Sequence, residues 1–555
     1  MGLLHPSPTL YIGDLPSSLP PLSSIPTISS SDSLESLTPG TLLRRWDFVS
    51  QFNSSCLKPS EIEPLRHRSD ELADGVVEVL GLAVGRGAGR DAYEAVRDYL
   101  QGREKELGRE RWENEREEDV VWRFWEEMGK EPPEEVSGLR GKDRRATPLR
   151  AFEQESVRRF ALLPDAEQSA DDLVSQAEPN LAEGQRVFWK YSAQIFIALM
   201  HFSLAGGFSA PRLAAVLHET NYLTSSARDA TFKRLLETTL FVLDAMSDMT
   251  VGTGRGWKSA MRVRLLHAQV RRRILTGKGR YNKYDVDSEG LPINQADLMA
   301  VLGAFMVAPM WSLRRMGIQV SPREEAAYQV AWRHVGYYLG LDIPLLHRLY
   351  GSSFHSAESA FASLAYSIFP SGSPPSDPLT TPQYRILSAV CGRPPRGKPI
   401  GHHLELCRRL LGPKMAEQLA LPRGRWTDKV SIEVEIWSGW TLLAFGQVYA
   451  KVCAGRGRRW EQKRQDWFRR VMELLVVYQL GERRTVFAWR EEGRQGEVLG
   501  REEGEEPGIE MGKHIGVEVR AQWKALLVEM GAAAATVVAG GVGAWSAISW
   551  VRSLF

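Results

Sequence analysis

The stretch Gln185-Arg-Val-Phe-Trp-Lys-Tyr-Ser-Ala-Gln-Ile-Phe-Ile-Ala-Leu-Met-His-Phe-Ser-Leu-Ala205 has the pattern of a buried helix. It is apolar over most of its length, and the pair Gly206-Gly207 that follows it is a common helix end. Lys190, Gln194 and His201 make it too polar for a comfortable membrane span. We therefore interpret it as a core helix of a folded domain.

Helical patterns also dominate the rest of the chain. Strand signals are few and isolated, and no repeat of fixed period is present. We predict an all-α fold, a large bundle of roughly ten or more helices. Apart from the opening stretch, the expected helices cover about residues 209–223, 227–247, 257–276, 294–316, 321–340, 355–369, 402–419, 431–453 and 458–480.

Composition divides the 555 residues into segments. Residues 1–40, rich in Ser and Pro, predict an irregular arm, and residues 41–150 predict short helices with many charges. The main helical domain is expected over 151–485, and an acidic flexible linker over 486–515. Residues 520–555 form the last segment.

The charge balance points to no nucleic-acid partner, because 70 basic and 68 acidic residues leave a net charge of only +2. The Glu and Arg residues of 91–135 alternate at helical spacing, which favours solvated helices.

The cysteines are widely spread and include no CxxC pair. The four cysteines are Cys56, Cys391, Cys407 and Cys453. Their spacing argues against a structural zinc site, covalently attached c-type haem and a disulfide framework.

The segment Met530–Val551 has the pattern of a membrane helix. Its 22 residues carry no formal charge, and at ~1.5 Å per residue they reach across a hydrocarbon core of ~30 Å. Because no secretory signal precedes it, we predict a single-pass C-terminal anchor that leaves the bulk of the chain cytosolic. A Gly/Ala-rich helix docked on the soluble domain is the alternative. Three small residues, Ala535, Ala539 and Gly543, form a stripe on this helix that is suited to self-association in the membrane.

A basic helix with one histidine is expected at Arg262–Arg271. Arg264, His267 and Arg271 fall at i, i+3 and i+7, on one helix face. A haem needs such a set: a neutral imidazole nitrogen for its iron and cations for its propionates. A solvated basic face with one incidental histidine is the alternative.

Seven segments in a fixed order resemble the family of ER-bound oxygenase mpaB and rubber oxygenase (latex-clearing protein). The resemblance covers roughly residues 180–425. It rests on Gly184-Gln-Arg-Val-Phe-Trp-Lys-Tyr, Ser203-Leu-Ala-Gly-Gly-Phe, Arg234-Leu-Leu-Glu-Thr238, Arg264-Leu-Leu-His-Ala-Gln-Val-Arg271, Pro292-Ile-Asn-Gln-Ala-Asp-Leu298, Trp332-Arg-His-Val-Gly-Tyr-Tyr-Leu-Gly340 and Leu410-Leu-Gly-Pro-Lys-Met-Ala-Glu-Gln-Leu-Ala-Leu-Pro422.

The resemblance implies a globin-like helical core with non-covalent haem b, which binds O₂ and cleaves a carbon–carbon double bond of an isoprenoid. It makes His267 the iron ligand and Arg264 its neighbour. The family's Arg-x-x-Lys-Thr pocket motif matches residues 234–238, but Glu237 replaces the lysine, so iron ligation by that lysine does not transfer. A pocket glutamate proposed as a base in the family corresponds, across a one-residue gap, to Glu219.

The residues themselves agree with part of this picture. Arg234, Glu237 and Thr238 share one helix face and can reach one cavity. A carboxyl group in an apolar pocket has a raised pKa, which suits proton abstraction next to an alkene. The alternatives are a surface ion pair between Arg234 and Glu237, and a solvated or capping role for Glu219.

Other histidines give weaker signals. His402 and His403 point about 100° apart on a helix and so cannot share one metal ion unaided. His218-Glu219 does not begin an HExxH motif, because Tyr222 stands where the second histidine is needed. We interpret His334 as a packed core residue.

The expected function is therefore that of a membrane-tethered haem b oxygenase, with the endoplasmic reticulum as the implied membrane. It would use O₂ to cleave a double bond of an apolar isoprenoid or prenylated molecule. Two alternatives remain. Glu237 leaves room for a peroxidase-like or hydroxylating haem oxidoreductase, and the core could instead be a non-catalytic membrane adaptor.

Overall fold

The structure is a computed structural model that describes residues 9–82, 91–133, 136, 179–220, 228–279, 281–369, 374–393, 397–480 and 516–536. The described residues divide into two compact units at Ile432 and Glu433, within helix α22 (Trp426–Val452). The first unit holds the candidate site.

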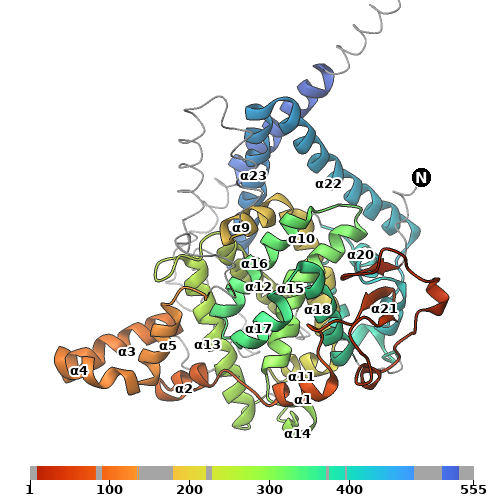
Figure 1. Cartoon of the computed structure of the whole chain (residues 1–555). Helices are drawn as coiled ribbons and strands as arrows, with labels where there is room; N and C mark the ends of the chain where they lie inside the picture. Colours follow the sequence, from red (N-terminus) through yellow and green to blue (C-terminus); the bar gives the residue numbers. More distant parts are fainter. Residues whose placement is uncertain are drawn as a thin grey trace, which may run out of the picture. The chain divides into compact units, whose positions relative to one another are not determined.

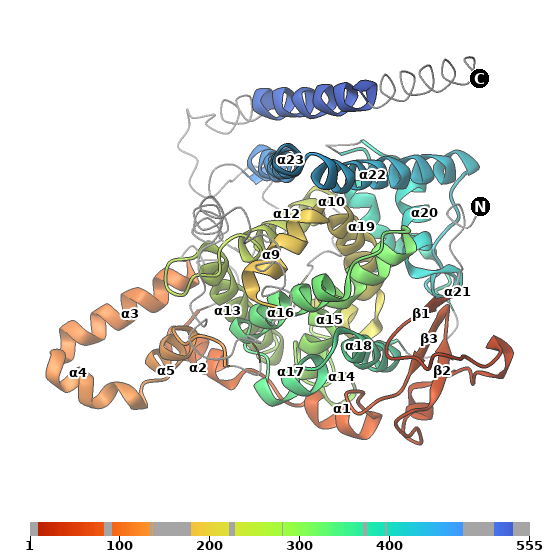
Figure 2. The ribbon, with the colours of Figure 1, turned by 45° about the horizontal axis from the view of Figure 1, so that its top comes forward.

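The centre of the first unit is helical (Figures 1 and 2), which confirms the predicted all-α class. Helix α15 (Gln295–Arg315) packs against α10 (Ser192–Ala198), η5 (Leu199–Gly206), α16 (Pro322–Tyr338) and α18 (Phe354–Ile368). The cavity described below is also lined by α11 (Pro211–Thr220), α12 (Arg228–Ala245) and α13 (Arg255–Leu275).

The remaining helices complete the two units. Their bounds are α1 (Pro59–Arg66), α2 (Glu71–Val79), α3 (Ala92–Leu107), α4 (Arg109–Glu115), α5 (Val120–Met128), α9 (Leu181–Lys190), α14 (Val286–Glu289), α17 (Ile343–Tyr350), α19 (Pro382–Val390), α20 (Ile400–Leu411), α21 (Pro413–Gln418) and α23 (Ala454–Leu480). Short 3₁₀ turns are η1 (Leu22–Ser24), η2 (Ser31–Leu34), η3 (Arg116–Glu118), η6 (Gly207–Ser209) and η7 (Pro378–Thr380).

The single helix expected over residues 185–205 consists of three pieces. Helix α9 ends at Tyr191, whose backbone leaves helical geometry at φ −107° and ψ 14°, and α10 then leads into the π-helical segment η5. Gly184 lets α9 approach α16 closely, since a Cβ there would lie 2.2 Å from the carbonyl oxygen of Ala327. The stretch is buried, as its composition predicts.

Two helical stretches, Ser192–Ser209 and Gln295–Arg315, are long and apolar enough to cross a membrane. Within the fold, however, 61% and 83% of them are buried. Core helices of soluble domains have the same length and composition, so neither stretch is by itself good evidence for a membrane span.

A small sheet stands where an irregular arm and short helices were expected. Strands β1 (Leu10–Tyr11), β2 (Leu42–Arg45) and β3 (Phe48–Gln51) lie in the order β1-β3-β2, with β1 parallel and β2 antiparallel to β3. Strand β3 packs against α18 (Figure 2). Strands of two to four residues are too short for a periodic signal, which explains why they were not predicted.

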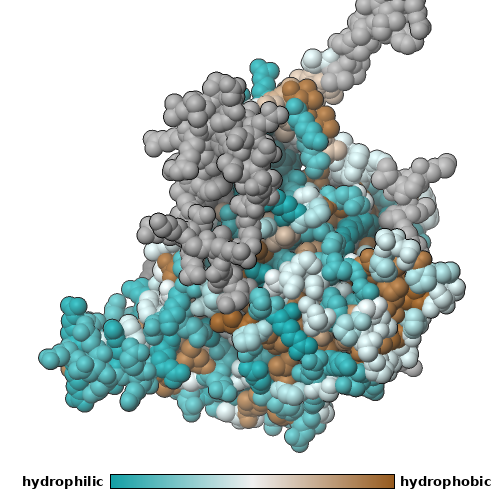
Figure 3. Space-filling view, in the orientation of Figure 1, coloured by the Kyte–Doolittle hydropathy of each residue, from teal (hydrophilic) through white to brown (hydrophobic). Residues whose placement is uncertain are grey.

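The charged helices α3 and α4 have a hydrophilic surface (Figure 3). Their alternating charges form ion pairs one turn apart, as in Arg109–Glu113 at 3.1 Å and Arg111–Glu115 at 2.7 Å. This arrangement is that of solvated helices.

In the second unit, residues 516–536 are helical and pack on α23. The rings of Trp467 and Trp523 stack with centroids 4.5 Å apart, and the Trp460 indole donates a hydrogen bond to the Leu526 carbonyl at 3.3 Å. Most of the predicted span Met530–Val551, Ala539 and Gly543 of its small-residue stripe, and the predicted linker lie outside the described residues. The membrane helix therefore stays a prediction.

Candidate active site

An apolar cavity of about 240 Å³ lies within the first unit. It is bordered by residues of η5, η6, α11, α12, α13, α15 and α16, together with neighbouring loop residues. Such a pocket, with few polar groups in an apolar wall, is typical of small-molecule sites. Besides the indole of Trp332, its polar side chains are Thr220, Arg234, Thr238, His267 and Asp297.

His267 lines this cavity from α13. Its Nδ1 is buried with no hydrogen-bond partner among the described residues. Burial, and after it the nearby positive charge of Arg271, lower the pKa of the imidazole to about 4, against the opposing effect of Asp70. The ring is therefore neutral at physiological pH and has a lone pair to donate, as a metal ligand requires.

Arg264 does not line the cavity. Its guanidinium group is buried and forms ion pairs with Asp70 at 2.6 Å and Glu127 at 2.7 Å. Burial lowers the pKa of the guanidinium group, but the negative charges of Asp70 and Glu127 outweigh this effect and raise the pKa above its usual value. The predicted role of Arg264 as a cation for a propionate is not supported by this arrangement.

Arg271 is engaged in the same way. It forms an ion pair with Asp74 of α2 at 2.9 Å and donates hydrogen bonds to the carbonyl groups of Pro292 and Ile293 at 3.2 and 2.7 Å. The two arginines thus fasten α13 to α2 and to the segment before α15. The spacing that was interpreted as a haem cradle instead positions the helix that carries His267.

The Arg234–Thr238 motif does reach the cavity. Arg234 and Thr238 line it, and Glu237 lies beside them in an ion pair with Arg234 at 2.7 Å. Both charged side chains are mostly buried, at 15% and 10% exposure, so the pair is not the surface pair considered as the alternative. The structure places Arg234 and Thr238 on the cavity that His267 also lines, whereas Glu237, which was expected to reach the same cavity, does not line it.

Glu219 does not line the cavity, and its carboxylate binds the backbone of a nearby turn. Its carboxylate accepts backbone N–H bonds from Tyr281, Asn282 and Lys283, each at 2.9 Å. Gly279 is needed beside it, because a Cβ there would lie 2.4 Å from Oε2. The predicted role of Glu219 as a base is not supported, since both oxygens hold the turn at 281–283.

Asp297 is a cavity residue that sequence reasoning missed. It is buried in the wall, where Arg212 donates to Oδ1 at 2.6 and 2.9 Å and the Asn294 amide donates to Oδ2 at 2.9 Å. Desolvation raises the pKa of this carboxyl group, against the effect of Arg212. The available signal was its place in the segment Pro292–Leu298, whose Asn294 caps α15.

The other histidines lie elsewhere. His201 Nε2 and His403 Nδ1 are 3.0 Å apart, and His402 Nδ1 lies 3.2 Å from the Ser431 hydroxyl. His334 is buried, does not line the cavity, and has its pKa lowered to about 3 by burial. Among the described residues, no three His, Cys, Asp or Glu side chains are grouped to hold a metal ion. A haem iron needs only one such side chain, so His267 is the candidate ligand.

Residues 189–444 match the family model described as ER-bound oxygenase mpaB/B'/Rubber oxygenase, catalytic domain. This confirms the resemblance found in the order of the segments. The matched segment contains α11 to α16 and thus His267, Arg234 and Asp297. The central part of this chain, residues 189–444, is thus similar to the catalytic domain of the mpaB and rubber oxygenase family.

A solved structure of latex clearing protein in its closed state is similar to this chain. The two share 16% sequence identity with a TM-score of 0.38, and the match covers 68% of this chain and 84% of the other. The similarity is too distant to support an argument about the site. A search of curated protein sequences gives no match.

The neutral state of His267 gives a testable pH dependence. Its pKa is lowered from 6.5 to about 4 in the folded protein, so the unfolded chain takes up the proton first as the pH falls. We expect the stabilisation to be complete above about pH 6.5 and lost towards pH 4, a change on the order of 2–3 kcal/mol. Urea unfolding of the protein without added cofactor at pH 7 and 4.5 measures it. His267→Phe should flatten this dependence, and an unchanged slope would contradict the buried neutral imidazole.

The bonds of Glu219 predict a loss of stability on substitution. Glu219→Gln replaces one acceptor oxygen by a donor that faces the backbone N–H groups of 281–283. We expect the free energy of unfolding to fall by about 1–3 kcal/mol. Thermal and urea unfolding measure this, with the exposed Asp287→Asn as control. If Glu219→Gln were as stable as the control, the carboxylate would not be holding this turn.

Proposed function

We propose that this chain is a haem b-dependent oxygenase that uses O₂ to cleave a carbon–carbon double bond of an apolar isoprenoid or prenylated molecule. The match of residues 189–444 to the oxygenase family model supports the oxygenase part of this proposal. The observation that carries the finer proposal is the neutral His267, placed in the wall of a large apolar cavity with its Nδ1 unpaired among the described residues.

The residues fit a haem, with one change from the sequence prediction. His267 would ligate the iron, since its ring is neutral and borders the cavity. Arg234 is the lining cation that could face a propionate, because Arg264 and Arg271 are bound to carboxylates away from the cavity. When bound, haem supplies the iron that binds and activates O₂.

The remaining wall residues prepare the substrate. Apolar side chains from α11 to α16 take an alkene out of water and exclude water from its surroundings. The Arg234–Glu237 pair and the Thr238 hydroxyl provide fixed polar groups at one side. The Asp297 carboxylate lines the wall and would accept a proton taken from the substrate. This is the role that the resemblance assigned to Glu219.

A second function on the same fold is favoured by Glu237, which stands where the family motif has a lysine. A haem oxidoreductase of the peroxidase-like or hydroxylating kind would share the ligand and the cavity. Products formed under ¹⁸O₂ separate the two functions, because cleavage by a dioxygenase labels both new carbonyl oxygens. A non-catalytic adaptor would bind no haem at all.

A membrane tether completes the proposal. The uncharged segment Met530–Val551 supports a C-terminal anchor, and the family's description as ER-bound supports the endoplasmic reticulum as its membrane. Such an anchor would keep the catalytic unit next to a lipid-soluble substrate.

The ligand assignment predicts the loss of a spectroscopic signal. Purified protein should show a Soret band typical of b-type haem, and His267→Ala should lose most of it, because no other described histidine lines the cavity. The exposed His218→Ala is the matched control. Circular dichroism checks that both variants fold. Stoichiometric haem retained by a folded His267→Ala would overturn the assignment.

The tether predicts a change of cellular fraction. Removing residues 537–555 takes away most of the predicted span but keeps residues 516–536, which pack on α23. We expect the truncated protein to move from the membrane pellet to the soluble fraction with its haem absorbance unchanged. A variant in which residues 537–555 are replaced by a Gly/Ser tail of equal length is the control for the loss of chain length. Release of the full-length protein from membranes by carbonate would contradict the anchor.

A further inference from the structure

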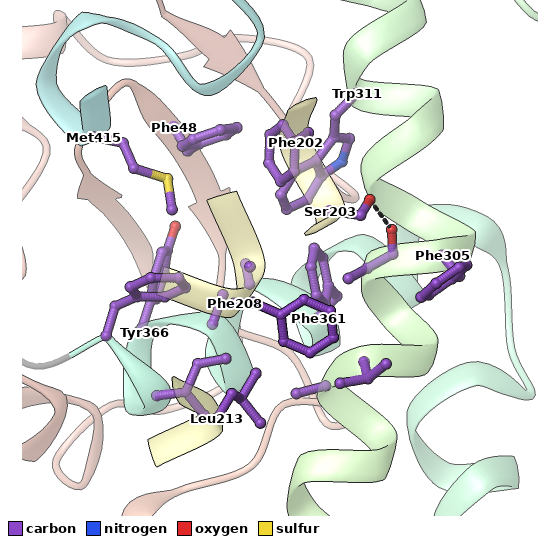
Figure 4. A pocket seen from close by; sticks show the side chains of 18 of the residues that line it. Phe48, Phe202, Ser203, Phe208, Leu213, Phe305, Trp311, Phe361, Tyr366 and Met415 are labelled. Carbon is purple, nitrogen blue, oxygen red and sulfur yellow. Dashed lines mark hydrogen bonds between the residues drawn. The ribbon is translucent and has the colours of Figure 1, made fainter. Parts of the chain in front are cut away.

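A second, smaller cavity of about 40 Å³ adjoins the His267 cavity. We call it the inner chamber. Aromatic rings surround it, including those of Phe48, Phe202, Trp311 and Phe361 (Figure 4). The two cavities are continuous in their walls, because four side chains border both: Phe208, Leu213, Val301 and Phe305.

The inner chamber has an apolar wall because its few polar groups are bonded to partners. The Ser203 hydroxyl donates to the Ala304 carbonyl at 2.5 Å, and the Trp311 indole donates to Glu358 at 2.8 Å (Figure 4 shows the first bond). The Trp46 indole donates to Gln418. A small cavity without free polar groups holds no ordered water and favours an apolar occupant.

The floor of the inner chamber comes from the β2–β3 hairpin, outside the segment that matches the family. Trp46 sits in the hairpin turn with a left-handed backbone (φ 52°), and its ring meets those of Tyr366 and Phe369 edge-on at 5.6 and 5.9 Å. Phe48 of β3 packs on Trp311 at 5.1 Å. A bulky residue held at positive φ is an uncommon and costly arrangement, which the surrounding contacts maintain.

Small residues on the opposite helices keep the space open. Larger side chains at these positions would fill the chamber. The small residues lie on α15, α18 and η6 and are Ala300, Ala304, Ala362, Ala365 and Gly207. The combination of aromatic floor and small-residue walls leaves a small apolar cavity beside the larger one, with room for the end of a chain but not for a bulky ring system.

We propose that the inner chamber receives the far end of an apolar chain whose reacting part lies in the His267 cavity, and that Trp46 and Phe48 limit the length of chain accepted. This rests on the proposed function, because it assigns the substrate class of the same site: a slender apolar chain that passes between Phe208 and Phe305. The hairpin thus acts as a specificity element that the family-matched segment does not contain.

The test fills the chamber and measures binding against chain length. Linear 1-alkenes of increasing length, delivered from cyclodextrin, are titrated calorimetrically into the protein as purified. For the wild type, Kd should fall about fourfold per added methylene, the value that ~0.8 kcal/mol corresponds to, until the chain reaches the hairpin. Ala304→Leu and Ala365→Leu, on two different helices, should stop this gain at a shorter length while short alkenes bind as before.

Ala326→Leu, on α16 and away from both cavities, is the matched control and should keep the wild-type length dependence. The proposal is overturned if both filled variants follow the wild-type length dependence, or if the wild type binds no alkene of any length. Absence of haem or of cleaved product, with the expected length dependence intact, would overturn only the proposed function. Binding is read without turnover, so the two failures are distinguishable.

Discussion

The candidate site depends on the buried contact between α13 and α2. Arg264 and Arg271, one turn before and one after His267, are bound to Asp70 and Asp74, and this fixes which face of α13 meets the cavity. Buried ion pairs add little net stability, but removing one partner costs about 3–5 kcal/mol, so the pairs enforce one register of the helix. Gly340 makes room for the first pair, since a Cβ there would lie 2.2 Å from Asp70 Oδ2.

The helical class, the family and the cavity position of His267 could be predicted from the sequence because each depends on local periodicity or on segment order. The role of the arginines could not. Spacing places Arg264 and Arg271 near His267, but it does not reveal partners nearly 200 residues earlier in the chain. The environment of Glu219 could not be predicted for a similar reason, because its three N–H donors belong to a turn more than 60 residues later.

Asp297 and the inner chamber mark a second limit of local patterns. The alternation in Leu42–Gln51 is too short to indicate strands, and nothing in it shows that Trp46 and Phe48 meet α15 and α18. Cavities arise where small residues from distant helices oppose one another, as Ala304 and Ala365 do. Such a coincidence is a property of packing, so the composition of any one helix cannot reveal it.

Different parts of the fold border the two cavities. The α13–α2 ion pairs hold the helix that carries His267, and the bonds of Asp297 fix a polar group in the wall of the same cavity. The hairpin, by contrast, touches only the far end of the apolar space. Under the proposal, substitution at Trp46 or Phe48 changes which chain fits and leaves His267 in place, because the two hairpin residues border the inner chamber and His267 borders only the larger cavity.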